Sequence, residues 1–131
     1  KELEARQVCQ TIVELLDLGD VRDELVSELS YGIQKRVELG RVLAMDPHLL
    51  MLDEPMAGMN VEEKQEMVRY IYRIMDEYKT SVFMIEHDMG IIMAIAERIM
   101  VLEFGREIAT GLPDEIQANP AVINAYLGAE T

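Results

Sequence analysis

Apolar residues recur at helical spacing along three stretches of this chain. The first stretch, residues 2–18, is expected to form an amphipathic helix that Gly19 ends. Its apolar face comprises Ala5, Val8, Cys9, Ile12, Leu15 and Leu16. The polar segment that follows, residues 20–28, has room for a short helical turn before the next pattern begins.

The second helical stretch begins after Ser30, a residue type that favours the N-cap of a helix. One face of this helix is expected to pack, because apolar and small residues recur on it. They are Ile33, Val37, Gly40 and Ala44. Gly40 and Ala44 would let a neighbouring element come close, and Asp46-Pro47 is expected to end the helix.

The third helical stretch is expected to run from Asn60 to about Lys79. Asn60 followed by Glu63 is the sequence signature of a capping box. The predicted buried face consists of Met67, Ile71, Ile74, Met75 and Tyr78. Short apolar runs flank this helix and predict buried strands at 49–53 and 81–86. A strand, a helix and another strand form a βαβ unit, so the two strands should pair in parallel.

Shorter elements are expected after residue 86. They are a helix at 89–96, a strand at 99–102, a hairpin partner at 107–110 after Gly105, and helices that begin at Pro113 and Pro120. The whole pattern predicts an α/β fold of short parallel strands and helices, with a C-terminal β-hairpin and two short helices. Residues 1–47 would form a helical part and residues 48–131 the part that carries the strands.

Composition narrows the range of partners. The chain has 131 residues, with 12 Lys and Arg against 25 Asp and Glu, so its formal net charge is −13. Nucleic acid and an anionic membrane surface are therefore not expected as direct partners. Lys35-Arg36 is the one basic pair near Ser30. No apolar run approaches the roughly 20 residues of a membrane span. Cys9 is the single cysteine and is expected to be an inert thiol in the core.

The candidate chemistry lies where the two predicted parallel strands end. The strand at 49–53 runs into Asp53-Glu54-Pro55, and His87 follows the strand at 81–86. The carboxyl ends of parallel strands meet at one edge of a sheet, where α/β proteins bind ligands. A solvated Asp-Glu pair in a loop and a structural histidine are the alternative interpretations.

Four motifs, in this order, resemble the nucleotide-binding subunits of ABC transporters. Leu29-Ser30-Tyr31-Gly32 resembles their signature motif, and Leu49 to Glu54 resembles the Walker B strand. Ala57-Gly58-Met59-Asn60 resembles the D-loop, and Phe83 to Asp88 resembles the segment with the switch histidine. The tail from Asn119 to Gly128 is similar to LivG-like subunits of the branched-chain amino acid branch.

The resemblance implies a partial P-loop NTPase fold of the ABC ATPase type and a catalytic role for two residues. Glu54 would orient or deprotonate the attacking water, and His87 would hydrogen-bond the γ-phosphate of ATP. Asp53 would hold Mg²⁺ through water. ATP and Mg²⁺ are thus the implied cofactors.

The remaining motif residues would act at a subunit interface. In this family Ser30 and Gly32 would touch the nucleotide held by the opposite subunit of a head-to-tail dimer. Gly58 and Asn60, in the D-loop, would lie at the same interface. The other implied partners are transmembrane permease subunits, which would hold the subunit at the cytoplasmic face of the cell membrane without inserting it.

Departures from the family pattern leave two alternatives open. The general signature reads Leu-Ser-Gly-Gly-Gln, whereas this chain has Tyr31 and Ile33 at the third and fifth places. No Gly-x-x-x-x-Gly-Lys-Ser/Thr phosphate loop occurs in the 131 residues. The chain is therefore expected to be the C-terminal half of an importer ATPase subunit, inactive alone. The alternatives are a non-catalytic interaction module of the same fold and a soluble ABC ATPase without a transporter.

Overall fold

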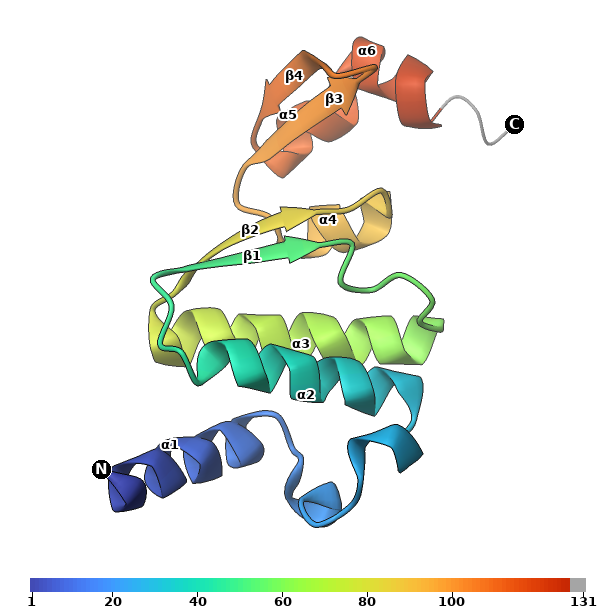
Figure 1. The fold of residues 1–131 in the computed structure, drawn as a ribbon. Coiled ribbons are helices and arrows are strands. Elements are labelled where there is room, and N and C mark those ends of the chain that lie inside the picture. Colours follow the sequence, from blue (N-terminus) through green and yellow to red (C-terminus); the bar gives the residue numbers. More distant parts are fainter. Residues whose placement is uncertain (128–131) are drawn as a thin grey trace. The chain divides into compact units, whose positions relative to one another are not determined.

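A two-stranded parallel sheet with helices on one face forms the first of two units into which the chain divides (Figure 1). The computed structural model describes residues 1–127, and the first unit comprises Lys1–Glu86. β1 (Leu49–Asp53) and β2 (Ser81–Ile85) pair in register from Leu49 opposite Ser81 to Asp53 opposite Ile85. The predicted strands and their parallel pairing are confirmed.

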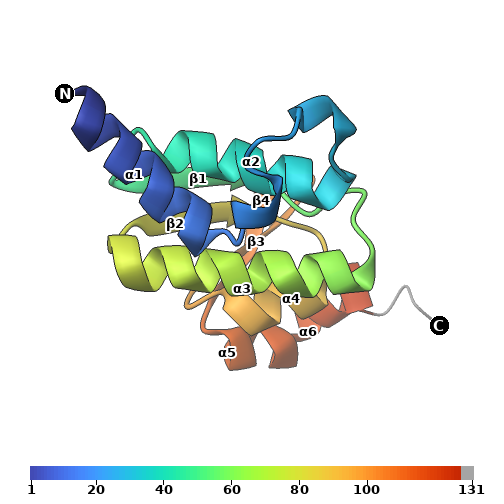
Figure 2. The same cartoon turned by 90° about the horizontal axis from the view of Figure 1, so that it is seen from below.

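Two adjacent helices, α2 (Tyr31–Leu43) and α3 (Val61–Tyr78), lie between the sheet and α1 (Glu2–Leu15) (Figures 1 and 2). Gly40 permits the close approach of α1 that its sequence position suggests. A Cβ atom on Gly40 would lie 3.1 Å from Ile12 Cγ2 and 3.1 Å from Leu16 Cδ1. The core between these layers includes Ile12, Leu15, Leu16, Leu39, Leu43, Leu50, Met67, Tyr70, Ile71 and Ile74.

The first helix differs from its prediction in length and in burial. α1 ends at Leu15, and the residue with left-handed backbone geometry is Asp17 (φ 51°) rather than Gly19. Cys9 is exposed and is not the core thiol expected from the pattern. The reason is visible in Figures 1 and 2, where the N-terminal turns of α1 project beyond α2 and α3. Only the last turn of α1, with Ile12 and Leu15, therefore packs against other helices.

The second and third helices confirm most of the predicted signals. α2 ends before Asp46-Pro47, but its buried residues are Leu39, Gly40 and Leu43, and Ala44 is exposed. The capping box of α3 is present, since Asn60 Oδ1 accepts from Glu63 N at 2.9 Å and Glu63 Oε2 from Asn60 N at 3.0 Å. The buried face of α3 also includes Tyr70, which the sequence prediction omits.

The two parallel strands are less buried than the apolar runs predict. In β1 only Leu50 is buried, while Leu49 and Met51 are 52% and 70% exposed. In β2, Phe83 and Ile85 are 54% and 51% exposed. Alternate residues of paired strands share a face, so these four form one apolar surface, here called the open sheet face. Within Lys1–Glu86 the helices pack on the opposite face of the sheet (Figure 1).

The second unit, from His87 onward, has its own core. It contains α4 (Met89–Ile95), β3 (Ile99–Glu103), β4 (Arg106–Gly111), α5 (Pro113–Ala118), α6 (Pro120–Val122) and a π-helical turn, Ile123–Leu127. The strands pair antiparallel, which confirms the hairpin. Ile99, Val101, Ala109, Ile116 and Val122 form the core. Gly128, which ends the tail motif, lies outside the described residues.

Among the helices of residues 1–127, none combines the length and the apolar character that crossing a membrane requires.

Candidate functional site

Asp53 and Glu54 lie where β1 passes into a tight turn at the carboxyl edge of the sheet. Both side chains are exposed. The backbone N–H of Glu54 donates to Ile85 O at 2.8 Å, which fixes this residue beside the end of β2. Glu54 has a left-handed backbone (φ 45°), a conformation that costs a non-glycine residue roughly 1 kcal/mol. The fold thus holds Glu54 in a specific and unusual conformation at the edge where ligands bind in α/β sheets.

The segment that follows, residues 54–60, is here called the 54–60 turn. Its two methionines are buried, Met56 at 1% and Met59 at 7% exposure, and anchor it to the unit. Ala57 N donates to Glu54 O at 3.1 Å, and Met59 N donates to Met56 O at 3.2 Å. Gly58 has φ 79°, which a side chain at this position would strain. The turn is therefore held in place by two buried side chains.

Side chains from two distant elements bind the backbone of this turn. The Tyr31 hydroxyl, from the first turn of α2, donates to Ala57 O at 3.0 Å. Glu86 Oε1, one residue beyond β2, accepts from Met56 N at 3.3 Å. From the sequence alone, Tyr31 is only a departure from the signature, and no role is expected for Glu86. A carboxylate directly after an apolar strand is the one signal that would have pointed to Glu86.

The start of α2 also meets the turn. Ser30 is the N-cap residue, as predicted, but its side chain makes no capping hydrogen bond. A Cβ atom on Gly32 would lie 3.0 Å from Glu63 Oε1, and Glu63 is the carboxylate that caps Asn60. The structure therefore links Gly32 to Asn60 through Glu63, and it links Gly58 to the start of α2 through Tyr31. Ser30 is the N-cap residue next to Tyr31.

Both side chains of the basic pair beside Ser30, Lys35 and Arg36, form ion pairs within the first unit. Lys35 Nζ lies 3.1 Å from Glu38 Oε2, and this hydrogen bond raises the pKa of Lys35. Arg36 Nη2 lies 3.4 Å from Glu66 Oε2, and Arg36 Nη1 donates to Leu16 O at 3.1 Å. A recess of about 40 Å³ beside Ser30, Gly32 and Arg36 has room for water only. An anion at the start of α2 would therefore bind at the surface.

His87 belongs to the second unit. It is exposed and follows Ile85, the last residue of β2, by two positions. Its predicted proximity to Asp53 stays a prediction. The next residue, Asp88, caps α4, because its Oδ1 accepts from Ile91 N at 3.3 Å.

The Asp53 carboxylate is the side chain expected to hold a metal ion at this edge. Across residues 1–127, no three His, Cys, Asp or Glu side chains gather in a way that could hold a metal ion. Mg²⁺ commonly binds through one or two carboxylates, several waters and the phosphates of a nucleotide. The exposed Asp53 carboxylate could therefore hold a Mg²⁺ ion that is also bound to a phosphate ligand.

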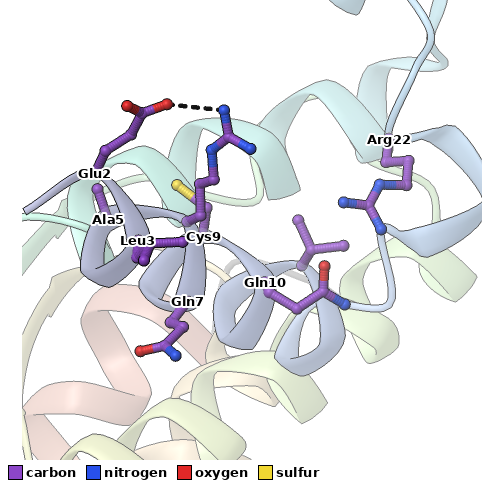
Figure 3. A pocket seen from close by; sticks show the side chains of 9 residues that line it. Glu2, Leu3, Ala5, Gln7, Cys9, Gln10 and Arg22 are labelled. Carbon is purple, nitrogen blue, oxygen red and sulfur yellow. Dashed lines mark hydrogen bonds and ion pairs between the residues drawn. The ribbon is translucent and has the colours of Figure 1, made fainter.

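A larger hollow than this recess lies elsewhere in the first unit. Figure 3 shows a groove of about 540 Å³ along α1, lined by residues that include Leu3, Cys9, Gln10 and Arg22. The ion pair at its rim joins Arg6 Nη2 and Glu2 Oε1 at 2.8 Å. None of the predicted site residues lines this groove, so it is separate from the candidate site.

Two family models each match part of this chain. The family model described as ABC transporter matches residues 1–57. The model described as Branched-chain amino acid ATP-binding cassette transporter matches residues 106–131. High-affinity branched-chain amino acid transport ATP-binding protein LivG of Salmonella typhimurium is 41% identical over 125 residues, which are 95% of this chain and 49% of that protein.

A second relative and a solved structure extend the likeness. High-affinity branched-chain amino acid transport ATP-binding protein BraF of Pseudomonas aeruginosa is 38% identical over 97% of this chain and 50% of its own length. A crystal structure of an ATP-binding cassette of an ABC transporter, in its ADP conformation, superposes with a TM-score of 0.86 at 28% identity. That match covers 98% of this chain and 52% of the solved chain. The chain thus spans about half the length of the relatives it matches.

Proposed function

Because this chain belongs to the ATP-binding proteins of ABC transporters, we propose that it forms part of the ATP-hydrolysing subunit of an importer for branched-chain amino acids. The likeness to LivG and BraF supports the choice of substrate class. Permease subunits and a second ATP-binding subunit would complete the transporter. The subunit would then work at the cytoplasmic face of the membrane.

The observation that carries this proposal is the geometry at the end of β1. Asp53 lies opposite Ile85 in a parallel pair, and the Glu54 backbone is bonded to Ile85 O at 2.8 Å. Two exposed carboxylates therefore lie at the carboxyl edge of a parallel sheet, the edge at which α/β proteins generally bind ligands. If β1 and β2 did not pair in this register, Asp53 and Glu54 would lie in an ordinary loop.

In the proposed mechanism each residue at this edge has a separate task. The Glu54 carboxylate would accept a hydrogen bond from the attacking water, orient it, and take its proton as the water oxygen bonds to the γ-phosphorus. The bond from that phosphorus to the bridging oxygen would break, and ADP would leave. Asp53 would hold the Mg²⁺ that neutralises the phosphate charge, with water between them. His87 would hydrogen-bond the terminal phosphate.

The start of α2 would complete the site of the opposite subunit. The first backbone N–H groups of a helix carry partial positive charge and attract anions. Ser30 and Gly32 lie at that terminus and would contact the partner's nucleotide. Gly58 and Asn60, linked to α2 through Tyr31 and Glu63, would lie at the same interface.

Replacing Glu54 in the complete transporter tests the proposal. Glu54→Gln should lower ATP turnover at least about 100-fold, the usual lower limit for loss of a general base, and should retain ATP binding. Glu77→Gln is the matched control, because Glu77 is an exposed carboxylate at the C-terminal end of α3. This variant should hydrolyse ATP at the wild-type rate. Brisk hydrolysis by Glu54→Gln would refute the role. A wild-type complex that binds no ATP would favour the interaction module.

A further inference from the structure

We propose that Tyr31 and Glu86 are positioning residues that hold the 54–60 turn between the start of α2 and the end of β2. This inference rests on the proposed function, because its consequence is a catalytic one. Neither side chain is expected to touch the nucleotide. Their task is to fix the backbone that links Glu54 to Gly58 and Asn60.

The two side chains bind neighbouring residues of the turn through opposite backbone groups. Glu86 Oε1 accepts from the N–H of Met56 at 3.3 Å, and the Tyr31 hydroxyl donates to the carbonyl of Ala57 at 3.0 Å. The two contacts span 30 and 26 residues of sequence respectively. The turn is therefore attached to both elements that flank it in space.

The ring of Tyr31 adds a second contact. A Cβ atom built on Gly58 would lie 3.5 Å from Tyr31 Cε1, so the ring covers the residue whose left-handed geometry reverses the chain. A glycine at the third place of the signature could not make either contact. Tyr31 thus gives this chain a direct link, within one subunit, between the signature motif and the D-loop.

The hydrogen bond from Tyr31 to Ala57 would couple movements of the signature motif to movements of the D-loop. The 54–60 turn begins at Glu54, which would orient water in one nucleotide site, and ends at Asn60, which would face the opposite subunit. Catalytic groups held loosely lose rate because their reactive geometry is populated less often. Loosening the turn should therefore lower kcat and leave KM for ATP nearly unchanged, because nucleotide-binding groups stay in place.

The first test measures the turn itself, without nucleotide. Tyr31→Phe keeps the ring and removes only the hydroxyl that bonds Ala57 O. Hydrogen exchange of the amides of residues 56–60 in the complete subunit should become about 3- to 10-fold faster, the effect expected for loss of one hydrogen bond. Tyr126→Phe is the matched control, because the Tyr126 hydroxyl also donates to a backbone carbonyl, that of Leu102, in the second unit. It should leave exchange in the turn unchanged.

The second test measures turnover in the complete transporter. Tyr31→Phe and Glu86→Ala should each lower kcat about 3- to 10-fold with KM within twofold, whereas Tyr126→Phe should match the wild type. Unchanged exchange in Tyr31→Phe, or faster exchange with normal kcat, would overturn the inference. A wild-type complex without ATPase activity would refute the proposed function instead, and the exchange result would still decide whether Tyr31 holds the turn.

Discussion

We expect the hydroxyl group of Tyr70 to contribute to the stability of the first unit. Its ring is only 2% exposed, and its hydroxyl donates to Asp17 Oδ2 at 3.1 Å. Arg73 Nη1 contacts the same carboxylate oxygen at 3.1 Å, and the guanidinium carbon of Arg36 lies 4.6 Å from the ring centre. This cluster joins the end of α1 to α2 and α3.

Tyr70→Phe isolates the hydroxyl, because the ring and its contact with Arg36 stay. A hydrogen bond to a charged acceptor typically contributes about 1.5–3 kcal/mol. The Asp17 side chain is 51% exposed and keeps its contact with Arg73, so water screens and partly replaces the lost bond. We therefore expect Tyr70→Phe to lower the free energy of unfolding by about 1 kcal/mol at neutral pH.

The effect should depend on the charge of Asp17. Burial raises the pKa of Asp17, but hydrogen bonds from Tyr70 and Arg73 and the positive charges of Arg73 and Arg69 outweigh it and lower the pKa overall. A carboxyl group with a lower pKa in the folded state stabilises the fold above its unfolded pKa, about 4. That contribution is lost as the pH falls through the folded value. The difference between wild type and Tyr70→Phe should therefore narrow in acid.

Urea unfolding followed by far-UV circular dichroism measures this effect, since the chain has no tryptophan. The substitution is compared at neutral pH in the wild type and in Asp17→Asn, which removes the charge without acid. The loss of unfolding free energy that Tyr70→Phe causes should be clearly smaller in the Asp17→Asn background than in the wild type. Equal losses in both backgrounds would show that the negative charge of Asp17 does not strengthen its hydrogen bond with the Tyr70 hydroxyl, and the reasoning would be refuted.

Two further predictions concern the packing of α1. Gly40→Val should destabilise the first unit by about 2 kcal/mol in urea unfolding, because the added atoms would press on Ile12 and Leu16. Gly19→Val is the control, because nothing lies within 4 Å of a Cβ atom built on Gly19. Equal destabilisation by the two substitutions would contradict the packing argument. Exposed Cys9 should react with a thiol reagent in the native protein nearly as fast as in 6 M guanidinium, about the concentration that unfolds most proteins. A much slower reaction of Cys9 in the native protein would contradict the exposure described for α1.

Local signals in the sequence predict most of the elements correctly. The capping box of Asn60 and Glu63, the Asp46-Pro47 break and the apolar runs each depend on neighbouring residues, and each is confirmed. The order of the motifs also leads to the family. Their chemical roles, including those of Asp53, Glu54 and His87, stay predictions.

Contacts between distant residues could not be predicted in the same way. Tyr70 and Asp17 are 53 positions apart, and Tyr31 and Ala57 are 26 apart, so only the packed helices bring them together. The exposure of Cys9 has the same cause, because periodicity defines an apolar stripe and the position of neighbouring helices decides how much of it is covered. Side-chain support of the 54–60 turn therefore emerges only from the folded structure.

The open sheet face has a consequence for the colloidal behaviour of the chain. Leu49, Met51, Phe83 and Ile85 expose an apolar surface that attracts other apolar surfaces, while a net charge of −13 makes copies of the chain repel one another. Salt shortens the range of that repulsion to about 8 Å at physiological ionic strength and leaves the hydrophobic attraction in place. Dilute buffer should therefore keep the chains dispersed, and added salt should favour their association through this face.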